Sequence, residues 1–201
     1  MKKLFPILFV ILLLPAPLRA GMPRITFGAE WGYTGTFLKT SQHNYICSEG
    51  YRIIDNPVTF WYYSNGSVLL NAGCDITKKL NLSAYSGLQG VYSHRWVVPV
   101  MLRARWCPGG LDSDGWLLFA GGGATFPTAV LRETGAEAQL GVGYRIALLH
   151  GISVDLLLSW NATLDSESIV DPDTHRFVPR SQMTQNTTEY QGINISLALN
   201  F

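Results

Sequence analysis

Hydrophobic and polar positions alternate with a period of two along the last segment of the chain. Every second residue there is apolar, and polar or small residues lie between; the apolar set is Ile193, Ile195, Leu197, Leu199 and Phe201. Successive side chains of a β-strand point to opposite faces, so this pattern predicts a strand with one apolar and one polar face.

The same alternation recurs along the chain and predicts about eight strands. They are expected near residues 25–37, 67–76, 80–92, 96–106, 116–125, 134–148, 152–160 and 193–201. An even number of strands places both chain ends on one side, as bacterial transmembrane barrels require. Pro99 falls inside the fourth strand and predicts a bulge or a later start there, because proline cannot donate a ladder hydrogen bond.

The predicted connections alternate between short turns and long loops. Short turns follow the second and sixth strands, and long connections follow the first (39–66) and the seventh (161–191). Within the first long connection, residues 57–63 are expected to extend as a hairpin above the membrane. Short turns on one side and long loops on the other are typical of a transmembrane β-barrel, although 107–115 is long for a turn and 93–94 is short for an outer loop.

The first twenty residues predict a secretory signal peptide. A basic start, Met1-Lys2-Lys3, precedes an apolar run of 4–14, and Leu18-Arg19-Ala20 offers a cleavage site. We therefore expect removal of 1–20 after about Ala20 and a single barrel domain over 21–201. An uncleaved membrane anchor is the alternative.

Composition favours a membrane barrel over a soluble domain. Hydrophobic residues make up 47% of the chain and charged residues 14%, where about a quarter is typical of soluble domains. The formal net charge of +1 gives no electrostatic case for nucleic acid. In a membrane, strands must close into a barrel, because lipid cannot satisfy an open sheet edge. A soluble periplasmic β-sandwich is the alternative and would ordinarily carry more surface charge.

Two segments resemble the hairpins of small outer-membrane β-barrel proteins common in Bacteroidota. They are LLNAGCDITKKLNLSAYSG at 69–87, where Cys74 stands in place of the more usual aromatic residue, and LGVGYRIAL at 140–148. The resemblance implies an OmpX/OmpA-like all-β, antiparallel transmembrane barrel of about eight strands in the outer membrane and no defined activity. The terminal strand also resembles the signal that the outer-membrane assembly machinery reads, so that machinery and outer-membrane lipid are the expected partners.

If the apolar faces point to lipid, the parity of each strand predicts the residues inside the barrel. The expected polar network consists of Glu30, Arg103, Arg105, Glu137, Arg145 and Asp155, joined by Asp75, Gln139 and Asn194. Buried charges persist when they are paired, and an eight-stranded barrel has room for side chains alone. The interior is therefore expected to be packed rather than a pore. A narrow proton or ion path is the alternative.

Aromatic residues crowd the first long connection and are the candidate binding surface for an unknown extracellular ligand. They are Tyr45, Tyr51, Phe60, Trp61, Tyr62 and Tyr63. Exposed aromatic side chains mark binding surfaces, but these rings could equally pack on each other or on the barrel rim. The three cysteines are expected to form no disulfide, and no metal site or cofactor is expected.

Catalytic motifs are weak. Ser93, His94 and His43 are expected near the outer rim, but neighbouring residues of a strand point to opposite faces, and no GxSxG motif is present. The sequence therefore predicts a non-enzymatic integral outer-membrane protein with a structural or surface-binding role. The alternative is a lipid-modifying barrel enzyme, an acyl hydrolase or acyl transferase that acts on lipid A or phospholipid.

Overall fold

A computed structural model describes residues 24–93, 95–128, 133–148 and 151–201. The predicted signal peptide, with its cleavage site after Ala20, lies outside the described residues. Within the described part of the chain, no helix is long and apolar enough to cross a membrane.

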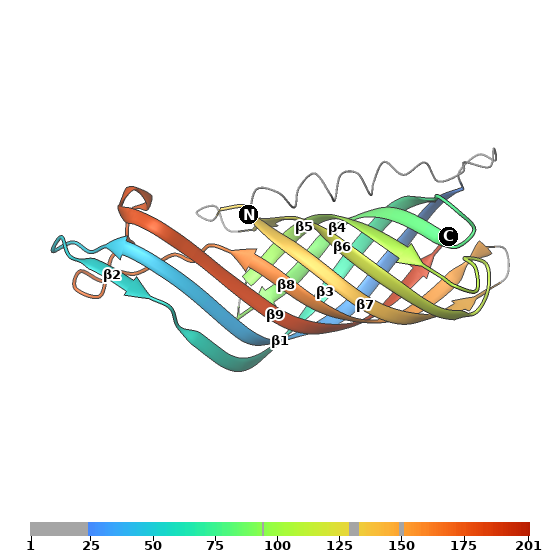
Figure 1. Cartoon of the computed structure of the whole chain (residues 1–201), viewed down its shortest axis with the longest axis horizontal. Coiled ribbons are helices and arrows are strands. Elements are labelled where there is room, and N and C mark those ends of the chain that lie inside the picture. Colours follow the sequence, from blue (N-terminus) through green and yellow to red (C-terminus); the bar gives the residue numbers. More distant parts are fainter. Residues whose placement is uncertain (1–23, 94, 129–132, 149–150) are drawn as a thin grey trace, which may run out of the picture.

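Nine antiparallel strands form one sheet that closes on itself (Figure 1). The strands are β1 (Ile25–Ile46), β2 (Arg52–Asp55), β3 (Val58–Asp75), β4 (Leu80–Tyr92), β5 (Arg95–Trp106), β6 (Gly115–Pro127), β7 (Gly135–Ala147), β8 (Ser153–Asp165) and β9 (Met183–Asn200). All but β2 follow one another around the wall, and β9 pairs back onto β1. The predicted all-β antiparallel barrel of eight strands is confirmed, and β2 adds a ninth strand outside the wall.

The seam between the first and last strands is continuous. β1 and β9 pair in one register from Gly28↔Asn200 to Thr36↔Gly192. At the end of the seam the backbone groups of Phe27 and Phe201 exchange two hydrogen bonds of 3.1 and 2.8 Å. No edge of the wall is left open along this stretch, which is the condition for a barrel that spans lipid.

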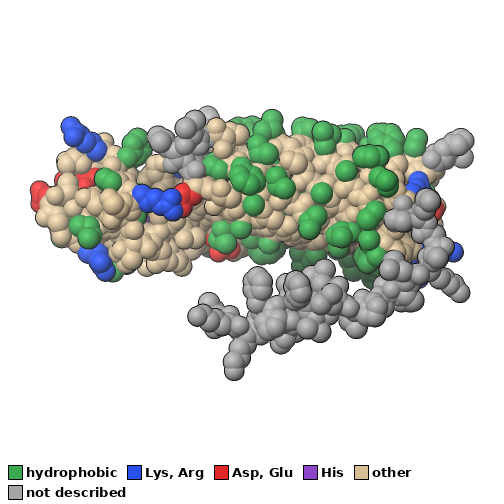
Figure 2. Space-filling view, turned by 90° about the horizontal axis from the view of Figure 1, so that it is seen from above, with side chains coloured by type: hydrophobic (Ala, Val, Ile, Leu, Met, Phe, Trp, Pro, Cys, Tyr) green, Lys and Arg blue, Asp and Glu red, His purple; other side chains and the backbone are tan. Residues whose placement is uncertain are grey.

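The wall is apolar outside and polar inside, the reverse of a soluble protein. On β7 the outward Leu140 is 62% exposed, whereas the inward Gln139 is 5% exposed. The outward positions of the eight wall strands, up to the level of Tyr33 on β1, carry no charged side chain. Figure 2 shows hydrophobic side chains along the barrel, with charged ones gathered toward the two ends of the molecule.

A small apolar group fills part of the interior. Leu117, Phe119 and Leu157 are buried there in one cluster. Gly141 on the neighbouring strand gives the Phe119 ring its space, because a Cβ at that position would collide with the ring. The interior is thus filled by side chains, as expected for eight strands.

The two ends of the barrel differ. At one end, which we call the turn end, β1 begins and β9 ends. The connections 76–79, 107–114 and 148–152 also lie there. At the other end β1, β3 and β9 continue well past their neighbours: they have 22, 18 and 18 residues against 12 or 13 for β4 to β8. We call the projecting part, residues 38–62 and 166–191, the extension (Figure 1).

In the extension, strands replace much of the two predicted long loops. Much of 39–66 and of 161–191 was expected to be loop, but β1 runs to Ile46, β3 begins at Val58, and β9 begins at Met183. The expected hairpin over 57–63 is here the start of β3, paired with β1 as Leu38↔Phe60. A β-bulge separates wall from extension, because Trp61 and Tyr62 together oppose Phe37.

Pro99 does not delay the fourth predicted strand or bulge it. β5 begins at Arg95 and pairs through Pro99 with Thr125 of β6. On its other side the ladder to β4 has no pairs at Gly87 and Leu88, opposite the proline. The missing N–H is therefore accommodated by a local gap in one ladder, without a change of register there.

Candidate functional site

At the turn end, the barrel interior is held by one carboxylate and two guanidinium groups. Asp155 accepts two hydrogen bonds of 2.7 Å from Arg145 and one of 2.9 Å from Arg105. Asn200 adds a bond of 3.0 Å to the same carboxylate. All four side chains are buried, and the two-pronged contact from Arg145 is the strongest geometry available to such a pair.

A second ion pair lies at the middle of the wall. Arg103 contacts Glu30 at 2.5 Å, and Ser196 donates to the same carboxylate at 2.8 Å. The Arg103 guanidinium also lies 3.9 Å from the centre of the Tyr85 ring, which adds a cation–π contact. The charge of Arg103 is thus neutralised on one side and covered on the other.

The structure brings together five of the six residues of the predicted network in these pairs. The sixth, Glu137, is 4% exposed and accepts a hydrogen bond of 2.9 Å from Gln89. Glu137 makes no ion pair within the described part of the chain. Together these side chains occupy the barrel interior from the turn end to its middle.

Where the wall meets the extension, a group of charged side chains that the sequence analysis did not single out covers the barrel opening. We call Lys39, Arg95, Asp165, Glu167 and Tyr190 the mouth cluster. Arg95 contacts Asp165 at 3.0 Å and Glu167 at 3.1 Å, and Lys39 contacts Glu167 at 2.9 Å. Burial by itself would raise the pKa of Glu167, but the hydrogen bond from Tyr190 and the two cations lower it overall.

Three tyrosine rings, which we call the tyrosine stack, pack on one another at tilted angles beside the mouth cluster. The ring centres of Tyr63 and Tyr92 are 4.2 Å apart, and those of Tyr92 and Tyr190 are 5.2 Å apart. Lys39 and Arg95 each lie 5.5 Å from one of these rings. The opening is therefore covered by rings and ion pairs drawn from β1, β3, β4, β5, β8 and β9 and from Glu167 of the connection between β8 and β9.

Residues 166–182, which we call the cover segment, fold over the end of the β1–β2 hairpin. Ile169 and Val178 pack on Tyr45 and Cys47 in a small buried core. This core holds the cover segment, which includes the short 3-10 helix η2 (Arg180–Gln182), against the hairpin.

An acidic residue fixes the turn of the cover segment. Asp171 accepts hydrogen bonds from the backbone N–H of Ser48, at 2.8 Å, and of Asp173 and Thr174. These bonds, that of Ser48 first, lower the pKa of Asp171. Asp173 in turn accepts a hydrogen bond of 3.0 Å from the Tyr51 hydroxyl. These carboxylates organise the segment rather than standing free in solvent.

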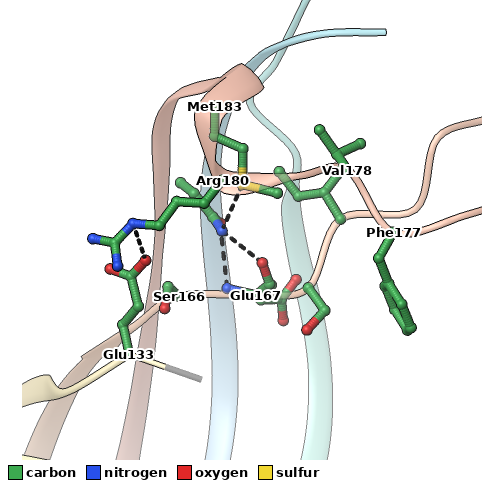
Figure 3. A pocket seen from close by; sticks show the side chains of 10 residues that line it. Glu133, Ser166, Glu167, Phe177, Val178, Arg180 and Met183 are labelled. Atoms are coloured by element: carbon green, nitrogen blue, oxygen red, sulfur yellow. Dashed lines mark hydrogen bonds and ion pairs between the residues drawn. The ribbon is translucent and has the colours of Figure 1, made fainter. Parts of the chain in front are cut away.

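A cavity of about 430 Å³ lies between the cover segment and β9 (Figure 3). Arg180 and Glu133 form an ion pair of 3.0 Å on one side of it, and Phe177 lies on the other. Asn186 closes its base with hydrogen bonds to the backbone of Glu167. The carboxylate of Glu167 is already held by the mouth cluster, so the cavity offers a mixed lining of apolar and polar side chains with one solvent-exposed ion pair.

The six aromatic residues of the candidate binding surface lie in different surroundings. Tyr45 is in the buried core, Tyr63 is in the tyrosine stack, and the Tyr51 hydroxyl holds Asp173. The remaining three are consecutive and exposed: Phe60 by 74%, Trp61 by 63% and Tyr62 by 65%. Both interpretations of the sequence therefore apply, each to a different part of the set.

The residues weighed for catalysis are placed as follows. Ser93 lies in the turn between β4 and β5, and His94 is outside the described residues. His43 lies on β1 in the extension, and its Nε2 has no hydrogen-bond partner in the described part of the chain. Burial lowers the pKa of His43, against the opposing effect of Glu167 and Asp55.

The three cysteines are free thiols: Cys47 and Cys107 are buried and Cys74 is half-buried. Among the described residues, no three histidine, cysteine, aspartate or glutamate side chains lie close enough together to hold a metal ion.

Comparisons with known proteins assign the chain to no family. No protein-family model matches it, and no curated protein does. Among solved structures, the chain is similar to the outer membrane protein OprG from Pseudomonas aeruginosa, with 12% sequence identity and a TM-score of 0.48. The match covers 90% of this chain and 98% of that one. A similarity at this level indicates nothing about what this chain binds or does.

Proposed function

We propose that this chain is an integral protein of a Gram-negative outer membrane, in which a sealed barrel anchors a surface-binding extension. One observation carries the proposal: the closed wall has an outward face without charged side chains and an inward face with paired charges. A soluble barrel would expose its polar face to water, and a sandwich would cover its apolar face with a second sheet. Lipid is the solvent that suits this wall.

Aromatic side chains mark the two levels at which the wall would leave the hydrocarbon. Trp106, Trp116 and Phe201 lie outward near the turn end, and Tyr33, Trp96 and Phe126 lie outward near the opposite end; all six are exposed. Such girdles are expected where a barrel meets the polar layer of the bilayer.

The extension would face the outside of the cell. Outer-membrane barrels place short turns in the periplasm and long segments outside, and the longest segments of this chain, those of the extension, project from the end opposite the turn end. In this orientation β9, the strand proposed to engage the assembly machinery, ends at the periplasmic side. A finer assignment, to the OmpX/OmpA-like barrels common in Bacteroidota, rests on the hairpin patterns at 69–87 and 140–148 and is part of the same proposal.

The barrel itself is proposed to act as an anchor rather than a channel. Ion pairs and apolar side chains fill the wall from the turn end to the middle, and the mouth cluster and tyrosine stack cover the other opening. Binding would then occur on the extension, where Phe60, Trp61 and Tyr62 are exposed. The lipid-modifying enzyme is the weaker proposal, because the Nε2 of His43 has no nucleophile bonded to it among the described residues.

Fractionation combined with heat-modifiability tests the proposal. The full chain is expressed in a Gram-negative host, outer membranes are isolated, and boiled and unboiled samples are compared on a gel. We expect an outer-membrane band whose migration changes on boiling, because a closed barrel resists detergent until it is heated. A soluble periplasmic band with unchanged migration would contradict the membrane barrel.

A further inference from the structure

We propose that the outward face of the extension next to β3 is a docking surface for the saccharide of lipopolysaccharide in the surrounding outer leaflet. The docking strip, as we call it, consists of Phe60 and Tyr62 on β3 and of Tyr33, which lies below them at the rim of the wall. This inference rests on the proposed function, since it requires the wall to lie in an outer membrane.

The docking strip continues the lipid-facing surface of the wall without a break. Tyr33 lies opposite Gly66 on β3, Gly35 lies opposite Ser64, and Leu38 lies opposite Phe60. Tyr33, Tyr62 and Phe60 therefore follow one another up the same outward face, and each is more than half exposed. Apolar area of this kind in one patch marks a surface that something covers.

A glycine seats the central ring of the strip. A Cβ at Gly35 would lie 2.7 Å from Cε2 of Tyr62 and 3.0 Å from its hydroxyl oxygen. The Tyr62 ring thus lies directly against the backbone of β1 at Gly35, where a side chain would push the ring away from the sheet. A flat ring with one face against the sheet and the other exposed is a platform for stacking.

The height of the strip decides between lipid tails and headgroups. Six residues separate Gly66, at the level of the Tyr33 girdle, from Phe60, and a strand rises about 3.3 Å per residue. With a strand tilt of about 40°, Phe60 lies roughly 15 Å above the girdle. Acyl chains end near the level of the girdle, so Phe60 lies at the height of the sugars of lipopolysaccharide.

The neighbouring chemistry suits a neutral sugar. From Val58 to Gly66, β3 carries no charged residue. Apart from Leu38 and Glu189, the adjacent outward positions of β1 and β9 are amides and hydroxyls, among them Gln42, Gln185 and Thr187. The amide of Gln185 donates to that of Gln42 at 2.6 Å. Pyranose rings present apolar C–H faces to aromatic rings and hydroxyl groups to such side chains. The charged group on this face nearest the strip is the acid Glu189, which disfavours the phosphates of lipid A.

A second copy of the chain suits the strip less well. Two barrels upright in one membrane are related by an axis along the membrane normal, so their β3 strands would both descend toward the membrane. Strands in that relation cannot pair antiparallel across the free edge of β3. The saccharide of the surrounding lipid is already present at the right height.

The test uses the full chain in nanodiscs of phospholipid without lipopolysaccharide. The probe is the core oligosaccharide released from the host's lipopolysaccharide by mild acid and then dephosphorylated, and saturation-transfer NMR reports its binding. We expect the wild type to bind it and the double variant Phe60→Ser/Tyr62→Ser to bind about tenfold more weakly or not at all. The matched control Phe177→Ser removes an equally exposed ring of the cover segment, and binding should be unchanged.

Three results would overturn the inference. They are binding that the double variant retains, binding to lipid A but not to the released saccharide, and a wild-type dimer in detergent that the double variant converts to monomer without any saccharide binding. Heat-modifiability of each preparation separates the membrane-barrel proposal from the docking proposal. A heat-modifiable outer-membrane barrel that does not bind the saccharide contradicts the docking proposal alone. If the double variant does not assemble, Gly35→Ala displaces the Tyr62 ring without removing it and should weaken binding as well.

Discussion

The barrel wall and the extension are built from the same strands, β1, β3 and β9, yet their side chains follow different rules. Below Thr36, β1 places apolar residues outward and polar ones inward; above Leu38, both of its faces carry polar residues. The change falls at the bulge opposite Phe37. The backbone pairing is the same on both sides of that point, so what changes is the solvent that each face must satisfy.

The two regions also differ in how they hold charge. In the wall, carboxylates pair with arginines that are themselves buried, as Asp155 does. In the cover segment, Asp171 pairs with backbone N–H groups and no cation. The first arrangement is costly to break because it leaves an unpaired charge in a closed space, whereas the second can open to water.

The largest effect is expected from Asp155→Ala. The substitution leaves Arg105 and Arg145 without their shared partner inside the wall. Removing one side of a buried ion pair costs about 3–5 kcal/mol, and we expect a loss of that order in the free energy of unfolding, measured by urea titration of the barrel in lipid vesicles. Arg180→Ala, which removes an exposed pair in the extension, is the control and should change stability by less than about 1 kcal/mol. Equal losses of unfolding free energy for the two variants would contradict the difference in charge pairing between the wall and the extension.

A charge on the outward face is the next most severe change. Leu140→Arg places a guanidinium against lipid near the middle of the wall, at a cost of about 2–4 kcal/mol. We expect less heat-modifiable protein in outer membranes and a lower unfolding free energy. Leu140→Ala at the same position separates loss of apolar area from insertion of charge. An arginine at the exposed Val58 of the extension should be tolerated, and if it is not, the extension is also in contact with lipid.

These two predictions concern residues that could be located from the sequence, and the reason is physical. Lipid demands strict alternation, so the strand predicted at 134–148 lies close to the observed β7, Gly135–Ala147, and the parity of each strand identified Glu30, Arg103 and Asp155 as inward. The pairing between them could not be predicted. Glu30 and Arg103 are 73 residues apart and meet across the barrel. The stagger between strands that brings them together cannot be read from the local sequence pattern.

The extension was largely missed for the opposite reason. On β1, Ser41 and His43 point inward and Gln42 and Asn44 outward, so both faces are polar and no periodic contrast appears. The mouth cluster was missed because its members are isolated charges in separate segments, as with Lys39 and Glu167, 128 residues apart. Position in the fold, not local pattern, makes them a cluster.

A smaller, local effect is expected from Tyr45→Ala. The ring fills the buried core under the cover segment, so its loss should release that segment while the wall stays closed. Limited proteolysis of intact vesicles should then cut within 166–182 faster than in the wild type, with heat-modifiability unchanged. Tyr51→Phe, which removes one exposed hydrogen bond from the same region, provides the milder comparison. A wall that unfolds together with the cover segment would show that the two regions are one cooperative unit.

The smallest effect is a dependence of the cover segment on pH. The folded pKa of Asp171 and that of Glu167 lie below their ordinary values of 3.8 and 4.5. Their contribution is therefore complete above those values and is lost as the pH falls through the lower folded ones. His43 of β1 acts earlier: burial lowers its folded pKa from 6.5. Below that pH, an opening of the extension that exposes the imidazole is favoured by uptake of a proton, and stability falls. Amide hydrogen exchange of residues 166–182, corrected for its intrinsic rate, should rise modestly below pH 6.5 and steeply below about pH 4. His43→Gln should abolish the first step and leave the second, while the amides of the wall respond to neither.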